Sequence, residues 1–237
     1  FNLKSVMDKK YYRVLNPLDE PSGKYLPSNR MSDFRREVFA YRKLSHCIYI
    51  FALKTGIQVG NAVRVAENVP AFLDILNPFF QSGKPYFQLM DIGVNDPVKE
   101  ISGDDLYNFV SNYIEEINES GLYYDWGKDH YFWEFAWEMV RNFEFPNMPS
   151  RMDSVFLFTD EDVARTFQTE NRDLQYKLVN VDLQEGVTEE FDMNWFTDVP
   201  SDITLSEVQE YARKYWSQQM TDNPIIEVLH KGIYTWN

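Results

Sequence analysis

The chain has 237 residues, 44% of them hydrophobic, with 18 Phe, 15 Tyr and 6 Trp. A chain of this length and composition can bury a sizeable core in one large domain or two small ones. Disorder is therefore not expected, and disulfide bonds are not required for stability. Its 37 acidic and 23 basic residues give a formal net charge of −14. Phosphate backbones and anionic lipids therefore repel it on average, although this leaves room for a local basic groove.

The cysteine and histidine content argues against metal and disulfide chemistry. Cys47 is the only cysteine, so an internal disulfide is impossible and a Cys-based zinc site is not expected. His46, His130 and His230 stand far apart without metal-ligand spacing, and no metal is expected. The sequence has neither a run of about 18 apolar residues nor a signal peptide in its first residues, Phe-Asn-Leu-Lys-Ser. We therefore expect a cytoplasmic protein without a membrane partner.

The first half of the chain is predicted to contain short strands and several helices. In chain order the pattern predicts a strand over 11–16, a helix from the N-cap Ser32 to about residue 44, a helical pattern over 61–76 broken at Pro70, a strand over 86–92, a helix over 104–119 between Ser102 and Gly121, and an aromatic-rich helix over 129–143. Residues 47–53 either continue the helix before them or form a buried strand, because periodicity does not separate the two in so short a run.

From residue 145 onward, strands and helices alternate. Pro146 and Pro149 end the preceding helix. The predicted elements are a strand over 154–158, a helix over 160–168, a strand over 176–183, a helix over 204–220, and two strands over 225–229 and 232–236 joined by His230-Lys231. This order is typical of an α+β fold.

Common catalytic signatures are absent from the sequence. It contains no Gly-x-Gly-x-x-Gly, no Gly-Lys-Ser/Thr phosphate loop and no Gly-x-Ser-x-Gly elbow. Three short segments remain as candidates for chemistry. They are Tyr12-Arg13, the segment 149–158 with the helix 162–167 that follows it, and the segment 223–232.

These three segments resemble the ADP-ribosyltransferase superfamily. That family has an Arg or His on an early strand, then a middle strand, often with Ser or an aromatic residue, that leads into a helix with an Ala and an aromatic, and a Glu on a late strand ahead of a turn. Here Arg13, Ser154 and Glu227 match these places in order and rough spacing. The stretch 135–158 is also similar to a poorly characterised bacterial and phage family with a suspected transferase fold.

The resemblance covers residues 10–16 and about 133–237, and it implies a fold for the whole chain. We expect a single ADP-ribosyltransferase-like domain over 1–237, with a split mixed or antiparallel sheet as its core. Residues 30–130 match no known pattern and are expected to form a mainly helical insertion, where acceptor recognition would lie.

The resemblance also implies NAD as co-substrate and a role for each candidate residue. Glu227 interrupts the apolar run 225–229, so its carboxylate must face solvent, a partner or a cleft. As the catalytic residue it would bond a ribose hydroxyl and stabilise the oxocarbenium-like centre formed as nicotinamide leaves. Ser154 would lie beside that ribose and help to place Glu227. The side chains that would bind NAD are Tyr12, Arg13, Arg151, Phe156, Phe158 and Phe167.

Each of these residues has an ordinary structural interpretation too. Arg13 either holds the pyrophosphate bidentately or forms a surface salt bridge. Arg151 either contacts phosphate or pins its loop to an acid on the helix before it. Ser154 could be an ordinary strand serine, Glu227 a solvent-facing residue on an edge strand, and the phenylalanines core residues.

Three functions follow as hypotheses. The first is an NAD-dependent ADP-ribosyltransferase, a toxin or phage-defence effector that modifies a nucleic acid or protein and has a possible antitoxin partner. The second is an inactive transferase-fold module that binds a protein partner, and the third is an NAD glycohydrolase. Position 225 is Ile where arginine-modifying transferases typically carry a second acid, and this argues against an arginine acceptor.

Overall fold

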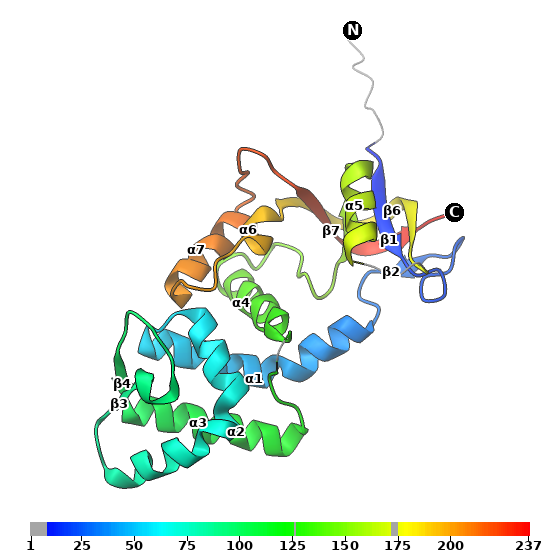
Figure 1. The fold of residues 1–237 in the computed structure, drawn as a ribbon. Coiled ribbons are helices and arrows are strands. Elements are labelled where there is room, and N and C mark those ends of the chain that lie inside the picture. Colours follow the sequence, from blue (N-terminus) through cyan, green and yellow to red (C-terminus); the bar gives the residue numbers. More distant parts are fainter. Residues whose placement is uncertain (1–8, 126, 172–174) are drawn as a thin grey trace. The chain divides into compact units, whose positions relative to one another are not determined.

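Helices and antiparallel strands both occur in the computed structural model of the chain, which describes residues 9–125, 127–171 and 175–237 (Figure 1). This confirms the predicted α+β class. The residues on which a signal peptide was excluded lie outside the described part. The chain divides into a sheet unit of Phe1–Met31, Phe143–Thr197 and Lys214–Asn237, and a helical unit of Ser32–Asn142 and Asp198–Arg213.

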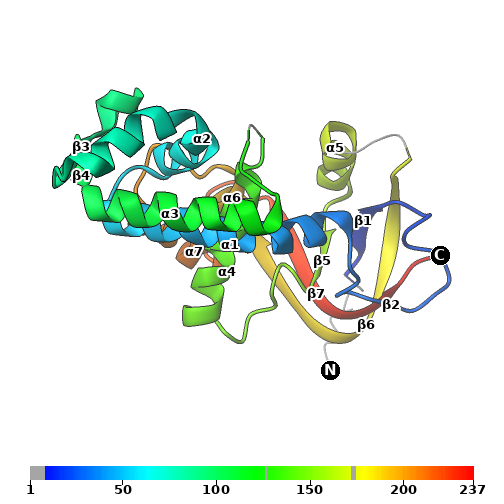
Figure 2. The same cartoon turned by 90° about the horizontal axis from the view of Figure 1, so that it is seen from below.

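The sheet unit is built on five strands. They are β1 (Tyr11–Leu15), β2 (Leu26–Pro27), β5 (Val155–Phe158), β6 (Lys177–Asp192) and β7 (Ile226–Thr235), with the helices α5 (Glu161–Asn171) and α6 (Asn194–Thr197) between them in the chain. The strand order is β2-β7-β5-β1-β6, and every pairing between these strands is antiparallel. Because β6 pairs with β7 as well as with β1, the strands β1, β5, β7 and β6 close into a ring. Figure 2 shows β6 and β7 as long curved strands running together.

One face of the sheet carries a hydrophobic core. Its buried residues come from all five strands and from the chain end, and they are Leu15, Leu26, Val155, Leu157, Val181, Val228, Tyr234 and Trp236. Alternate residues of a strand point to opposite faces, so their neighbours along the strands lie on the other face. That other face carries the candidate site.

The strands β6 and β7 are longer than the sequence pattern predicts. The two strands predicted over 225–229 and 232–236 are one strand, because His230 and Lys231 pair with Thr188 and Val187 of β6 instead of forming a turn. His230 is buried, and its ring nitrogens contact the Thr188 Oγ1 at 2.8 Å and the Ile233 carbonyl at 3.0 Å. These partners satisfy a polar side chain inside the sheet.

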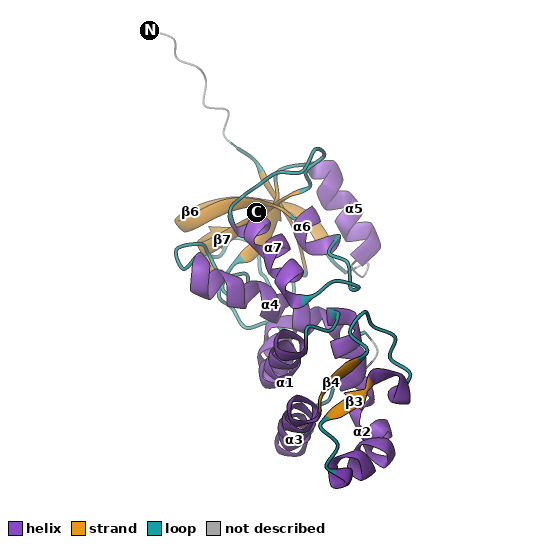
Figure 3. Cartoon of the chain, turned by 90° about the vertical axis from the view of Figure 1, so that its left-hand side faces the viewer, coloured by secondary structure: helices purple, strands orange, loops and turns teal. Residues whose placement is uncertain are grey.

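The helical unit contains most of the helices. Its elements are α1 (Asp33–Thr55), α2 (Val59–Ser82), β3 (Tyr86–Gln88), the 3-10 turn η1 (Leu89–Ile92), β4 (Glu100–Ser102), α3 (Gly103–Ser120) and the greater part of α4 (Asp129–Glu144) and α7 (Leu205–Trp216). Helices α1 and α3 lie side by side (Figure 3). The ring of Phe51 stacks on that of Phe109 between them at 4.2 Å. In the part of the chain that the structure describes, no helix combines the length and apolar character needed to cross a membrane.

The structure confirms the helix caps that the sequence predicts, but it does not contain the predicted break in α2. Ser32 and Ser102 accept hydrogen bonds from the first turns of α1 and α3, and Gly121 ends α3 in the left-handed conformation. Residues 47–53 continue α1. The predicted break at Pro70 is wrong, because α2 runs through it.

The burial of apolar residues explains why α2 continues through Pro70. An interior proline removes one helix hydrogen bond and costs about 3 kcal/mol. Val65, Ala66 and Val69 on its N-terminal side and Leu76 on its C-terminal side are all buried, and burying such side chains outweighs a cost of this size. The strand predicted over 86–92 is also shorter, since β3 ends at Gln88 and η1 follows.

Candidate functional site

The three candidate segments lie on neighbouring strands. Arg13 is on β1, Glu227 is on β7, and Ser154 directly precedes β5, the strand between them. Tyr12 pairs with Phe158, and Phe158 pairs with Glu227. The Tyr12–Phe158 pair is the only ladder pair between β1 and β5 among the described residues. The ring is therefore closed between these two strands by one pair, and we call the place where they diverge the opening between β1 and β5.

The register divides the candidates between the two faces of the sheet. Directly opposed residues of antiparallel strands point to the same face, so Tyr12, Phe158 and Glu227 share one face. Arg13 follows Tyr12 and points to the opposite face. The sheet therefore does not bring Arg13 and Glu227 together.

Glu227 lies in a buried cluster with an arginine and a tyrosine. The side chains of Arg151 and Glu227 are 7% and 8% exposed, and the Arg151 Nη1 forms an ion pair with the Glu227 Oε1. The Tyr215 hydroxyl donates to the same Oε1 at 2.6 Å and accepts from the Arg151 Nη1 at 2.8 Å. The three polar groups thus bond one another in a closed triangle, which we call the Glu227 cluster.

Aromatic rings surround the cation of this cluster. The Arg151 guanidinium carbon lies 4.8 Å from the ring centre of Phe156, 4.3 Å from that of Phe196 and 5.6 Å from that of Tyr215. The Tyr215 ring stacks on Phe191 at 4.6 Å. Burial, and the nearby Glu227 charge, raise the pKa of Tyr215 well above its ordinary value despite the opposing effect of Arg151, so its hydroxyl keeps its proton.

Only one oxygen of the Glu227 carboxylate is engaged. Both donors bond Oε1, and no residue within the described ranges donates a hydrogen bond to Oε2. A carboxylate can accept about four hydrogen bonds through its two oxygens. Oε2 therefore keeps hydrogen-bond acceptor capacity that the described residues do not use.

Arg13 is engaged on the other face in a second cluster of the same composition. Its Nε and Nη2 donate to the Glu20 Oε2 and Oε1 at 2.7 and 2.6 Å, and its Nη1 donates to the Phe156 carbonyl at 3.0 Å. The Tyr234 hydroxyl donates to the Glu20 Oε2 at 2.6 Å. Arg13 therefore links the loop that follows β1 to the edge of β5, where the sheet opens.

The charge of Arg13 also sets the ionisation of its partner. Burial alone would raise the pKa of the Glu20 carboxyl, but the Arg13 charge and the hydrogen bonds from Arg13 and Tyr234 outweigh it and lower the pKa. Burial likewise opposes the charge on Arg13, yet Glu20 leaves its pKa raised. Glu20 and Arg13 are thus a tightly coupled ion pair.

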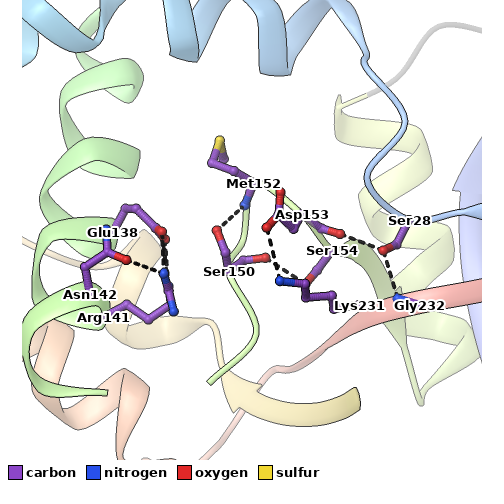
Figure 4. Close-up of polar contacts among 10 residues, drawn as sticks. All are labelled: Ser28, Glu138, Arg141, Asn142, Ser150, Met152, Asp153, Ser154, Lys231 and Gly232. Carbon is purple, nitrogen blue, oxygen red and sulfur yellow. Dashed lines mark hydrogen bonds and ion pairs between the residues drawn. The ribbon is translucent and has the colours of Figure 1, made fainter. Parts of the chain in front are cut away.

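Ser154 does not contact Glu227. It is fully buried, and its hydroxyl donates to the Ser150 carbonyl at 2.7 Å (Figure 4). It precedes Phe158 by four residues, and Phe158 is the residue opposite Glu227. At a rise of about 3.3 Å per residue, Ser154 and Glu227 are roughly 13 Å apart along the sheet. Its observed role is to close the turn that carries Arg151.

The same turn is tied to β7 on its other side. The Ser28 hydroxyl donates to the Asp153 carbonyl at 2.6 Å and accepts from the Gly232 backbone N–H at 2.9 Å (Figure 4). Lys231 contacts the Asp153 carboxylate at 3.3 Å. These bonds hold the residues between α4 and β5, and so they fix the backbone on which Arg151 stands.

The remaining aromatic candidates lie near the cluster or in the core. Phe156 packs on Arg151 as described. Phe158 is buried, and its ring centre is 5.3 Å from that of Phe167 on α5. Tyr12 is partly buried and shares the face of Phe158. Phe158 and Phe167 thus attach α5 to the sheet.

Sequence reasoning missed Tyr215, Phe196 and Glu20. Tyr215 follows Val208 and Ala212 at helical spacing, a pattern that predicts burial but gives no sign of a polar contact with Glu227. Phe196 lies on α6, a single turn that no periodicity reveals.

Within the described ranges, no group of three or more His, Cys, Asp or Glu side chains could hold a metal ion.

Comparison with known proteins gives one family. A family model described as "Protein of unknown function (DUF2441)" matches residues 93–235, more than half of the chain. No curated protein matches the sequence significantly. The match includes β5, β6, β7 and the whole Glu227 cluster, but not β1.

Proposed function

The chain belongs to this family of unknown function, and from the arrangement of its strands we propose that it is an NAD-dependent ADP-ribosyltransferase with a macromolecular acceptor. One observation carries the proposal. The three segments that resemble the superfamily are separated by more than 50 residues in the chain, yet they lie on or directly beside three adjacent strands, β7-β5-β1. The opening between β1 and β5 agrees with the split sheet that the resemblance implies.

In this proposal Glu227 acts on the ribose that bears nicotinamide. The bond between the ribose C1′ and the nicotinamide nitrogen breaks, and neutral nicotinamide leaves with the bonding electrons. The carboxylate stabilises the positive charge that develops on the ribose, and the free Oε2 accepts a hydrogen bond from a ribose hydroxyl. The acceptor then forms the new bond to C1′ and loses its proton.

The other candidates take different parts. Arg151 and the aromatic rings around it stand on the Glu227 face, and with Tyr12 they are the residues best placed to contact NAD. Arg13 stands on the opposite face, bound to Glu20 and to the β5 backbone. We assign it to holding the opening between β1 and β5, in place of the pyrophosphate contact that the sequence suggested.

The test is nicotinamide release from NAD by the purified full chain, with RNA, DNA or protein as acceptor. Release that depends on one acceptor class supports the transferase and identifies its target. Release that is equal without any acceptor identifies a glycohydrolase instead.

Glu227→Gln is the variant that tests the site. Its amide oxygen can still accept from Tyr215 and Arg151, whereas Glu227→Ala would remove the carboxylate that forms the buried ion pair with Arg151. We expect turnover to fall at least about 100-fold, since the charge that stabilises the transition state is gone. The exposed Glu161→Gln on α5 is the matched control. Full turnover by a folded Glu227→Gln protein rules out Glu227 as the catalytic residue.

A second candidate function has an observation of its own. The two arginine–glutamate pairs stand on opposite faces, and each is neutralised by its partner within the chain. A non-catalytic module that binds a protein partner would need no converging site. Absence of both NAD binding and nicotinamide release under every acceptor condition would favour this second function.

A further inference from the structure

The Glu227 cluster contains one hydroxyl whose position matters for the carboxylate. We propose that Tyr215 is a positioning residue, which together with Arg151 fixes the Oε1 of Glu227 and leaves Oε2 as the one oxygen open to a ligand. This inference rests on the proposed transferase activity. Its basis is that the two donors, Tyr215 at 2.6 Å and Arg151, converge on a single oxygen.

The surroundings of Tyr215 hold its hydroxyl in one place. The ring is fully buried, stacks on Phe191 with an interplanar angle of 12°, and meets Trp216 edge-on at 4.8 Å. The Arg151 Nη1 donates to the same hydroxyl and so directs its proton toward Glu227. A hydroxyl fixed by ring packing and by a second donor restricts the rotation of the carboxylate that it bonds.

The cluster on the opposite face has the same three residue types, but both oxygens of its carboxylate accept hydrogen bonds. In the Arg13, Glu20 and Tyr234 cluster, Oε1 accepts from the Arg13 Nη2, while Oε2 accepts from both the Arg13 Nε and Tyr234. Both oxygens of Glu20 are engaged, as expected of a carboxylate that only stabilises the fold. The same three residue types around Glu227 leave Oε2 without a donor among the described residues, and this difference supports the proposed role.

The test compares two Tyr→Phe variants, each of which removes only a hydroxyl group. Tyr215→Phe keeps the ring stack on Phe191. Tyr124→Phe is the matched control, because Tyr124 is equally buried and its hydroxyl contacts the Ser45 hydroxyl at 2.5 Å within the helical unit. Nicotinamide release is measured in the full chain over a range of NAD concentrations to give kcat and KM, and melting temperature is measured for each variant.

We expect Tyr215→Phe to lower kcat about 100-fold while KM for NAD stays within about twofold, because a misplaced catalytic group costs rate more than ground-state binding. Tyr124→Phe should keep both constants near those of the wild type. If Tyr215→Phe does not fold, Arg151→Lys keeps the charge but loses the planar fork, and it should show the same fall in kcat.

The outcomes separate the inference from the proposed function. Unchanged kcat in folded Tyr215→Phe, with an active wild type, overturns the positioning role and leaves the transferase intact. An equal loss in Tyr215→Phe and Tyr124→Phe shows that the hydroxyl serves only stability, which also overturns it. A wild type that releases no nicotinamide with any acceptor refutes the proposed function, and the positioning role with it.

Discussion

At the scale of single residues, the sheet unit contains two ion pairs, one buried and one largely buried, which differ in their hydrogen bonding. The Glu20 carboxylate is saturated, and its side chain and that of Arg13 are 15% and 17% exposed. Removing one partner of such a pair leaves a buried charge without compensation. We infer that Glu20 contributes to stability through its charge. In Glu227, by contrast, both hydrogen-bond donors bond Oε1, and Oε2 has no donor among the described residues.

Glu20→Gln should destabilise the protein by about 3 kcal/mol at pH 7, since Arg13 stays buried and charged. Because the pKa of Glu20 is lower in the folded state, the stability it contributes is complete above its ordinary pKa of 4.5 and is lost as the pH falls below that value. Urea unfolding between pH 3 and 7 measures this effect.

The same experiment on Glu161→Gln provides the control, because that glutamate is 46% exposed and pairs with Arg165 on the surface. Its effect should not exceed about 0.5 kcal/mol. If Glu20→Gln shows the acid dependence of the wild type, Glu20 does not carry the linkage that we assign to it.

The residues of the site could be predicted in part. Glu227 stands out in sequence because a charge interrupts an apolar strand, and Arg151 stands out because it lies in the segment 149–158 that resembles the superfamily. Their pairing could not be predicted, since it depends on the fold around β5 and β7 and on Tyr215, more than 60 residues from Arg151. The pairing of Arg13 with Glu20 could not be predicted either, because Glu20 lies in a loop without a periodic sequence pattern.

At the scale of elements, the long pairing of β6 with β7 holds the sheet unit together. One extra residue on β6 between Leu183 and Gly186 forms a bulge, and there the backbone of Gly186 meets that of Gly232. A Cβ atom at Gly232 would overlap the Glu185 carbonyl oxygen and lie 2.7 Å from the Gly186 Cα. The close approach of these strands therefore requires glycine.

Gly232→Ala should destabilise the protein by about 3 kcal/mol, because the two backbones must move apart to make room for a methyl group. Gly83→Ala is the control. Gly83 ends α2 in the left-handed conformation with nothing within 4 Å of its Cβ position, and the change should cost about 1 kcal/mol. Chemical unfolding of both variants measures the difference. Equal costs would show that the strands tolerate a side chain at the crossing.

The elements themselves follow closely from sequence wherever local signals decide them. The caps Ser32, Ser102 and Gly121 were predicted because each bonds or bends the chain locally. The continuity of α2 through Pro70 and of β7 through His230 was not, because tertiary burial and cross-strand pairing override the local preference.

At the scale of the whole molecule, the excess of negative charge is the dominant feature. Like charges at a net −14 repel one another more strongly in the folded chain than in the expanded unfolded chain. The Debye length falls from about 30 Å at 0.01 M salt to about 8 Å at 0.15 M, so added salt screens this repulsion. Buried pairs such as Arg151–Glu227 are screened much less.

We therefore expect the melting temperature at pH 7 to rise as NaCl increases from 0.01 to 0.15 M, and to rise less at pH 5, where carboxylates begin to bind protons and the net charge is smaller. Thermal unfolding monitored by circular dichroism measures both. Sucrose at equal osmolality is the control, since it stabilises by exclusion without screening and should act alike at both pH values. A melting temperature that falls with salt would contradict this expectation. It would mean that surface ion pairs such as Arg165–Glu161 stabilise the folded chain more than the net charge destabilises it.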